Sequence, residues 1–338
     1  MFNLKNDYSK IAHRNILEAL LKYEDEYNVG YGLDEHSKHA KQLIQNHLAT
    51  DCDIHFLVGG TSANKIAIAH ALKSYEAVIS VDTGHINVHE TGAIEATGHK
   101  IIVVNGVDGK ITPTEIENVI LTHVDEHMVI PKMVYITQST EIGTLYNKQE
   151  LIEIYNVCKK YNLYLFLDGA RLAVALDKSD ITLADLSLYT DIFYIGGTKN
   201  GAMLGEAVVI SNDELKKNFR FSIKQHGGMY SKGFIAGIQF EELFKDDLYF
   251  KLGKNSNIMA EKLALGLERR GIKLEYPYIT NQLFVNVSNE LYEKLKEFVL
   301  FELWIDKVNS KVIRFVTNFS TTKEELDEFF VALDNILY

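Results

Sequence analysis

Lys199 and Asp168 are the two residues whose types and positions first indicate chemistry. Lys199 lies in Asp191-Ile-Phe-Tyr-Ile-Gly-Gly-Thr-Lys-Asn200, where two glycines leave its amine little crowded by side chains, and Asp168 ends a second apolar run, Leu163–Leu167. An amine can form a Schiff base with an aldehyde, and a buried carboxylate can keep a ring nitrogen protonated. Together they indicate a site for pyridoxal 5′-phosphate (PLP), whose ring accepts electrons.

A site for the cofactor phosphate is predicted in the run Gly59-Gly60-Thr61-Ser62, between an apolar segment and an amphipathic one. Free N–H groups and the positive dipole end at the start of a helix attract an anion. Gly60, Thr61 and Ser62 are therefore candidate ligands. The same run is also an ordinary strand-to-helix turn with a hydroxyl cap, so the assignment depends on the lysine–aspartate pair.

His85 follows the apolar segment Ala77–Val81. An imidazole there could stack on a flat cofactor ring and carry a proton near neutral pH. The alternative is a turn histidine bonded to the backbone. His89 and Glu90 lie one turn further on, and Glu90 could orient the loop.

Composition narrows the class of protein. The chain has 338 residues, 46% of them hydrophobic, with a formal charge of −11 and a pI near 5.6. This acidity argues against nucleic acid as a partner, because phosphate backbones require an excess of Lys and Arg. Cys52 and Cys158 are too few for a disulfide framework, and we expect no structural metal. The N-terminus is polar and no apolar run would span a membrane, so we expect a cytoplasmic protein without membrane contact.

The order of apolar segments predicts an α/β fold. Amphipathic stretches at 63–73, 114–121 and 148–161 separate short apolar runs, which implies a mostly parallel seven-stranded sheet with helices on both faces. The predicted strands are Ile54–Val58, Ala77–Val81, Lys100–Val104, Met133–Thr137, Leu163–Leu167, Ile192–Ile195 and Glu206–Ile210. Because ligands gather at the carboxyl ends of such strands, Asp168 and Lys199 are expected at one shared site.

A smaller α+β unit is predicted beyond residue 235. It would contain helices at 255–270, 288–300 and 321–337 and strands at 283–287 and 312–316. We expect residues 1–30 to pack with this small domain, residues 31–235 to form the large PLP-binding domain, and residues 236–338 to form the small domain.

Several motifs, taken in order, resemble one family. Gly60-Thr61, His85 with Glu90, Leu167-Asp168-Gly-Ala-Arg171-Leu, Lys199 and Arg314-Phe-Val-Thr317 are similar to motifs of the low-specificity threonine aldolase and β-eliminating lyase group. That group has the aspartate aminotransferase fold of PLP-dependent transferases, fold type I. Tyr31-Gly32 resembles the N-terminal Tyr-Gly element of the group, and the resemblance extends from Asp7 to near the C-terminus.

The resemblance implies a role for each matching residue. Lys199 would bind the cofactor covalently, Asp168 would pair with its ring nitrogen, and His85 would stack on the ring. Arg171 and Arg314 would bind the substrate's α-carboxylate, with Tyr31 also at the substrate. A planar guanidinium suits this, because it can form two parallel charge-assisted hydrogen bonds to a carboxylate.

The implied reaction is cleavage of the Cα–Cβ bond of a β-hydroxy amino acid. L-Threonine or allo-threonine would give glycine and acetaldehyde. Two alternatives stay open: a PLP-dependent β-eliminating lyase acting on another amino acid, and a PLP-binding protein with little catalysis.

Two departures from the family bear on the site. Where the group has a Glu-Asn-Thr-His segment, the chain reads Thr137-Gln-Ser-Thr-Glu141, and Thr140 is interpreted as occupying the histidine's place, so that His85, His89 or a water would act as the base. Gln138 could still contact the cofactor.

The second departure concerns the cofactor phosphate. The group has an arginine near Tyr230 that reaches the phosphate in a neighbouring subunit, and Lys224 or Lys232 would have to substitute for it. The resemblance thus implies a homodimer or homotetramer with active sites at the subunit interface.

Overall fold

The computed structural model describes residues 1–337, and its centre is a seven-stranded sheet. In spatial order its strands are β2 (Asp53–Leu57), β8 (Glu206–Ile210), β7 (Ile192–Gly196), β6 (Tyr164–Asp168), β5 (Ile130–Thr137), β3 (Glu76–Val81) and β4 (Lys100–Val104). Only β8 runs antiparallel to its neighbours. The predicted mostly parallel sheet is confirmed, and all seven predicted segments are strands.

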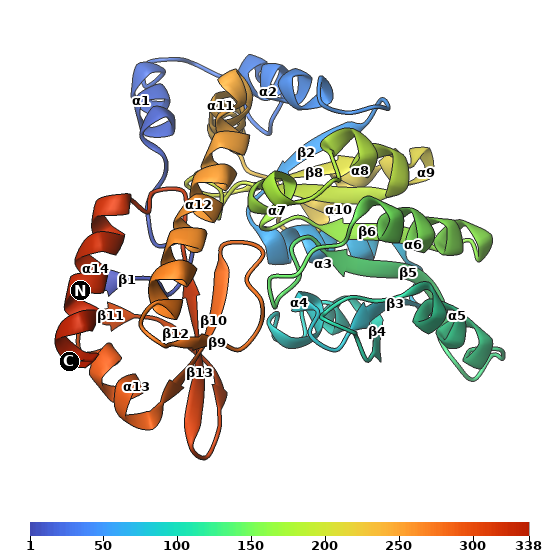
Figure 1. Cartoon of the computed structure of the whole chain (residues 1–338). Helices are drawn as coiled ribbons and strands as arrows, with labels where there is room; N and C mark the ends of the chain where they lie inside the picture. Colours follow the sequence, from blue (N-terminus) through green and yellow to red (C-terminus); the bar gives the residue numbers. More distant parts are fainter. Residues whose placement is uncertain (338) are drawn as a thin grey trace.

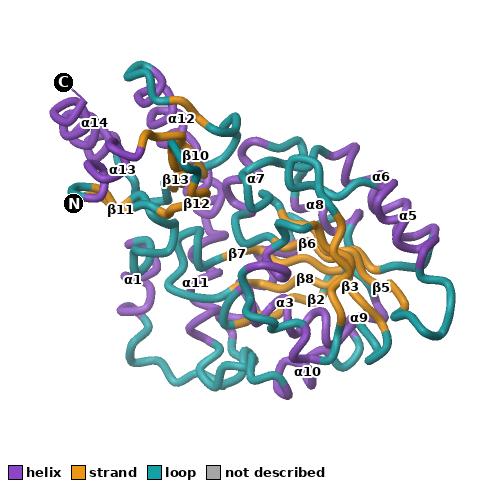
Figure 2. Tube along the Cα trace, turned by 90° about the horizontal axis from the view of Figure 1, so that it is seen from below, coloured by secondary structure: helices purple, strands orange, loops and turns teal. Residues whose placement is uncertain are grey.

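Helices cover both faces of this sheet, because successive strand residues point to opposite sides and both sides are apolar. Ile79 packs into the cluster on one face and its neighbour Val78 into the cluster on the other. The first face carries α5 (Pro113–Thr122), α6 (Lys148–Lys160), α7 (Leu172–Lys178) and α8 (Leu183–Tyr189), and the second carries α3 (Gly60–Ala71), α4 (His85–Val88), α9 (Asp213–Lys216) and α10 (Phe219–Gln225). The strands therefore form a buried middle layer (Figure 2).

The C-terminal part, orange to red in Figure 1, is built on a second sheet, which is antiparallel. Its strands are β12 (Glu302–Asp306), β13 (Ser310–Val316), β10 (Gln282–Ser288) and β9 (Lys273–Leu274). Helices α12 (Leu248–Glu268), α13 (Asn289–Lys296) and α14 (Lys323–Leu337) accompany it. A separate apolar cluster fills this part, as predicted for a smaller α+β unit.

The N-terminal segment contacts both parts of the molecule. Strand β1 (Phe2–Asn3) pairs in parallel with β11 (Val299–Leu300), beside α14 and near the C-terminus (Figure 1). Helices α1 (Arg14–Lys22) and α2 (Glu35–Gln45) pack instead on α11 (Phe234–Phe244). The domain boundaries at residues 30 and 235 stay predictions.

Several elements differ from the sequence prediction, and the strands β9 and β12 were not predicted. The helix expected at 288–300 ends at Lys296, because β11 takes up hydrogen bonding with β1 from the far end of the chain. The helix expected to begin at 255 begins at Leu248, and α11 was not predicted. Short 3₁₀ helices span Glu95–Thr97 and Lys245–Asp247. Within residues 1–337, no helix combines the length and apolar character needed to cross a bilayer.

Candidate active site

One cavity of about 840 Å³ opens at the carboxyl ends of the central strands. It lies between the loops that follow β2, β3, β6 and β7 and the strands β12 and β13 of the C-terminal sheet. Seven of the predicted site residues line it: Gly60, Thr61, His85, Asp168, Arg171, Lys199 and Arg314. The fold therefore gathers at one place residues that are far apart in the sequence.

Lys199 lies in the turn that follows β7. A side chain at Gly196 would come within 2.4 Å of the Ala170 carbonyl oxygen, and one at Gly197 within 2.5 Å of the Gly205 carbonyl oxygen, so this approach of two loops requires glycine at both positions. Burial, and next the charge of Arg171, lower the pKa of the Lys199 amine. The structure thus favours the uncharged, nucleophilic form of the amine more than water would.

Asp168 ends β6 and is held by donors from both neighbouring strands. Tyr135 of β5 donates its hydroxyl to Oδ2 at 2.5 Å, and Tyr194 of β7 donates to Oδ1 at 2.5 Å. Asn64 and the Ala170 N–H donate at 3.1 and 3.0 Å. Burial by itself would raise the Asp168 pKa, but the charge of His85 and the tyrosine hydrogen bonds outweigh it and lower the pKa. This carboxylate is therefore held ionised, which a partner of a protonated ring nitrogen requires.

A hydrogen-bonded chain joins Asp168 to His85. Glu90 Oε1 accepts from Asn64 Nδ2 at 2.7 Å and lies 2.8 Å from His85 Nδ1, while Asn64 also bonds to Asp168. Burial lowers the His85 pKa, but the hydrogen bond to Glu90 and the charges of Glu141 and Asp168 together outweigh this, and the net shift is upward. The Glu90 carboxylate thus fixes the orientation of a ring whose other edge faces the cavity.

Arg171 forms a two-point ion pair with Asp7 of the N-terminal segment. Its Nε and Nη2 donate to the two carboxylate oxygens at 2.7 and 3.2 Å, and both side chains are buried. Asn281 also donates to Asp7, at 3.0 Å. The edge of the guanidinium that carries Nε and Nη2 is therefore occupied. Nη1 makes no hydrogen bond to any residue of the described range 1–337 and is available to a ligand.

Arg314 enters the cavity from β13 of the C-terminal sheet. Its guanidinium lies 5.3 Å from the centre of the Trp304 ring, and Nη1 donates to Gln282 at 3.3 Å. Its Nε is buried without a hydrogen-bond acceptor among residues 1–337. Burial, and next the charge of Arg171, lower the Arg314 pKa. Two guanidinium groups facing one cavity with unused donors are suited to an anionic ligand.

The opposite end of the cavity is formed by the start of α3. Gly60 is its first residue, and a Cβ there would approach the Tyr194 hydroxyl to 3.0 Å. Glu206 lines the same end, and burial raises its pKa to about 7. Lys199, Asp168 and the bare N–H groups of α3 thus supply the amine, the ring partner and the phosphate site that PLP needs, and we conclude that the residues present fit this cofactor.

Three other predicted residues are arranged differently from the cavity group. Ser62 is partly buried near Gly228 and is not part of the lining. Gln138 is buried with its amide bonded in both directions to the backbone of Tyr146, at 3.0 Å each. Lys224 lies 5.1 Å from the ring centre of Tyr31, on another surface.

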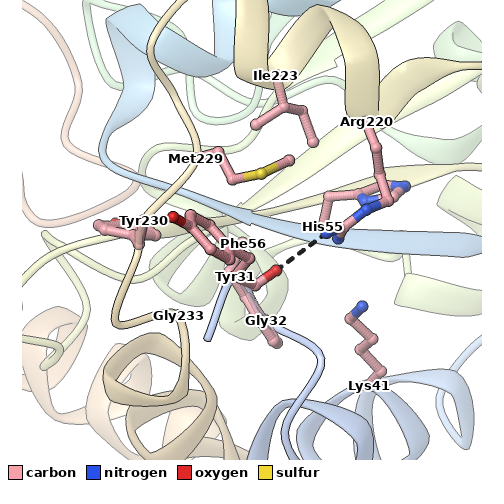
Figure 3. A pocket seen from close by; sticks show the side chains of 10 residues that line it. All are labelled: Tyr31, Gly32, Lys41, His55, Phe56, Arg220, Ile223, Met229, Tyr230 and Gly233. Atoms are coloured by element: carbon pink, nitrogen blue, oxygen red, sulfur yellow. Dashed lines mark hydrogen bonds between the residues drawn. The ribbon is translucent and has the colours of Figure 1, made fainter. Parts of the chain in front are cut away.

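Tyr31 lines a separate small pocket, together with Lys41, His55, Arg220 and Tyr230 (Figure 3). Arg220 Nη2 donates to the Tyr31 carbonyl oxygen at 3.1 Å. Within a single chain, Tyr31 and Lys224 therefore lie apart from Lys199.

Thr140 does not line the cavity. Its hydroxyl lies 2.6 Å from that of Thr144 and accepts the Thr144 N–H at 3.1 Å, so it closes a local turn. The next residue, Glu141, lines the cavity instead. The interpretation that Thr140 takes the place of the family's histidine stays a prediction.

Sequence reasoning missed several residues of the site. Tyr135 and Tyr194 lie inside apolar strands, where they read as core packing, although each stands on a strand adjacent to Asp168 and at its carboxyl half. No local sequence motif marks Asp7 or Glu206 as a site residue. The tyrosines on the strands beside Asp168 were the sequence signal that could have identified part of the site.

Residues 12–290 match the family model described as beta-eliminating lyase. The chain belongs to the beta-eliminating lyase family. The low specificity L-threonine aldolase of Pseudomonas aeruginosa, a curated relative, is 34% identical over 271 residues, which cover 79% of this chain and 78% of the relative.

Solved structures are similar to this chain over its whole length. A threonine aldolase from Leishmania major has 45% identity, a TM-score of 0.98 and full coverage of both chains. Alanine–glyoxylate aminotransferase from Nostoc sp., at 15% identity and a TM-score of 0.74, covers 100% of this chain and 95% of its own and shares the fold. The predicted family and the aminotransferase-like fold are confirmed.

Proposed function

We propose that the protein is a PLP-dependent threonine aldolase that cleaves L-threonine or allo-threonine to glycine and acetaldehyde. One observation carries the proposal: a single cavity brings a buried amine, an ionised aspartate, an oriented histidine and two guanidinium groups together. The likeness to threonine aldolases from Pseudomonas aeruginosa and Leishmania major supports the choice of reaction.

Lys199, Asp168, His85, Gly60 and Thr61 would hold the cofactor. Lys199 would bind its aldehyde, since the lowered pKa leaves more of the amine uncharged. The ionised Asp168 would face the ring nitrogen, His85 would pack on the ring, and the start of α3 would receive the phosphate. When bound, PLP supplies an acceptor for the electron pair of the bond that breaks.

Arg171 and Arg314 would hold the α-carboxylate of the amino acid. They approach from different parts of the chain, α7 and β13, so a substrate carboxylate between them is fixed in orientation as well as position. This orientation determines which bond at Cα is perpendicular to the cofactor ring and therefore breaks.

The proposal includes assembly and location. A homodimer or homotetramer would place Tyr31 and Lys224 of one chain at the cavity of another, and the acidic chain would work in the cytoplasm. Both statements stay predictions, as do the assignments of Ser62 and Gln138 to the cofactor.

Acetaldehyde release from L-threonine by the PLP-loaded protein tests the function directly. The matched control is Lys199→Ala, which should lose both the release and the covalent cofactor found by mass spectrometry after borohydride reduction. Release that persists in the variant would remove Lys199 from its role. If wild-type protein binds PLP covalently but releases no acetaldehyde, the aldolase proposal fails and β-elimination of another amino acid becomes the reaction to test.

A further inference from the structure

Glu141 is a carboxylate in the cavity for which the roles above have no use. It lies within the turn closed by Thr140 and Thr144, and only 8% of the residue is exposed. It lines the cavity with Lys199 and the two guanidinium groups. Within residues 1–337, its side chain makes no hydrogen bond and no ion pair shorter than 4 Å, so both oxygens are available to a ligand.

The surroundings of Glu141 place it at the substrate end of the cavity. Its charge acts on five basic side chains, which come from four different segments: His85, His89, Arg171, Lys199 and Arg314. A carboxylate that shares the cavity with the amine and the two arginines is available to the side chain of a bound amino acid, since those groups hold its other two substituents.

The other groups of the cavity are less suited to accept a proton from the substrate. Asp168 is bonded to four donors, and Glu206 lies at the phosphate end. His85 already shares one nitrogen with Glu90, and its raised pKa makes it a poorer acceptor at neutral pH. Burial lowers the pKa of His89, which favours its neutral form, but His89 is exposed to solvent, with its ring 6.4 Å from that of Trp304.

We propose that Glu141 is the catalytic base that removes the proton from the β-hydroxyl group of the substrate. The inference rests on the proposed aldolase function. The O–H bond breaks and its proton passes to Glu141, the oxygen forms the aldehyde C=O bond, and the Cα–Cβ bond breaks with its electron pair passing to the cofactor. A proton then reaches Cα to give glycine, and Glu141 releases its own to solvent.

Glu141→Gln separates this role from a structural one. The variant should lower kcat for threonine cleavage by about 10²–10⁴-fold, the usual contribution of a general base. It should still exchange the α-proton of glycine in D2O, measured by NMR, because that step involves no β-hydroxyl group. Cofactor loading, followed by absorbance, should stay within a few-fold of wild type.

The matched control is Glu302→Gln. Glu302 also lines the cavity, but it is half-exposed and lies 3.7 Å from Lys5 Nζ, so its neutralisation should change kcat only a few-fold. Threonine cleavage that stays within threefold of wild type in Glu141→Gln overturns the inference. So does a parallel loss of cleavage and glycine exchange, which would show a positioning role.

Failure of the aldolase proposal gives a different result. Wild-type protein would then exchange glycine protons without cleaving threonine at all. Glu141→His provides a second variant: an imidazole at this position should restore part of the cleavage lost with glutamine, whereas a merely structural glutamate would not be rescued by it.

Discussion

At the scale of single residues, the site depends on carboxylates in four different environments. Asp168 is held ionised by two tyrosines, Glu90 is bonded to a histidine, Glu206 is buried with a pKa raised to about 7, and Glu141 has no partner in the described chain. The surroundings of each carboxylate, not its residue type, determine its protonation state and its role, because burial and hydrogen bonds shift the pKa of a carboxyl group in opposite directions.

Glu90→Gln should lower the pKa of His85. Burial remains in the variant, but the charge-assisted hydrogen bond that contributes most to offsetting it is lost. NMR titration of ring-labelled histidine should find the wild-type His85 pKa above about 6.5 and the variant's below it. Glu95→Gln, on the nearby 3₁₀ helix, is the control and should leave the titration unchanged. An identical His85 titration in wild type and Glu90→Gln would contradict the assigned contact.

At the scale of elements, the strand pattern carried most of the information. Alternating and continuous apolar runs predicted every strand of the central sheet, and the strand ends then placed Asp168 and Lys199 together. What failed depends on contacts between distant segments. Val299–Leu300 became a strand only because Phe2–Asn3 lies beside it, and Tyr135 acquired its role from a strand that follows it in sequence.

Gly253→Ala should destabilise the fold through the packing of α12 on α7. A Cβ at this position would lie 2.2 Å from the Ala173 carbonyl oxygen, in backbone that cannot move without moving Arg171 at the start of α7. We expect a loss of about 1–3 kcal/mol in the free energy of unfolding by urea, even after the gain in helix propensity. The exposed Lys254→Ala should stay within about 0.5 kcal/mol of wild type. Equal stability of both variants would mean that the helices can separate freely.

At the scale of the whole molecule, the site is assembled from segments that are far apart in the sequence. The N-terminal segment supplies Asp7, the large sheet supplies Lys199, and the C-terminal sheet supplies Arg314. Motifs could mark the arginines, because resemblance preserves residue order. They could not show that Arg171 is already paired, since Asp7 has no local pattern that marks it as a partner.

Asp7→Asn should cost about 3–5 kcal/mol of stability at neutral pH, because it leaves the buried Arg171 without its counter-charge. Burial raises the pKa of Asp7, but the charges of Arg171 and Lys199 and the hydrogen bonds from Arg171 and Asn281 together outweigh this, and the net shift is downward. The stabilisation is therefore complete above about pH 4 and is lost as the pH falls towards the lower, folded-state pKa.

Urea unfolding of wild type and Asp7→Asn between pH 3 and 7 measures this dependence. The stability difference should be constant near neutrality and should shrink in acid. Asp25→Asn, an exposed residue on the same N-terminal stretch, is the control and should match wild type. A difference that grows on acidification would contradict the ion pair.

The pairing of Phe2–Asn3 with Val299–Leu300 has a consequence for synthesis on the ribosome. Strand β1 leaves the exit tunnel long before β11, so this pairing must wait until Val299–Leu300 has been translated. Until then the segment that carries Asp7 is not held by that pairing, although Arg171 has already emerged. The nascent large sheet thus exists for a time without a completed site, because Arg314 of β13 is translated after all seven of its strands.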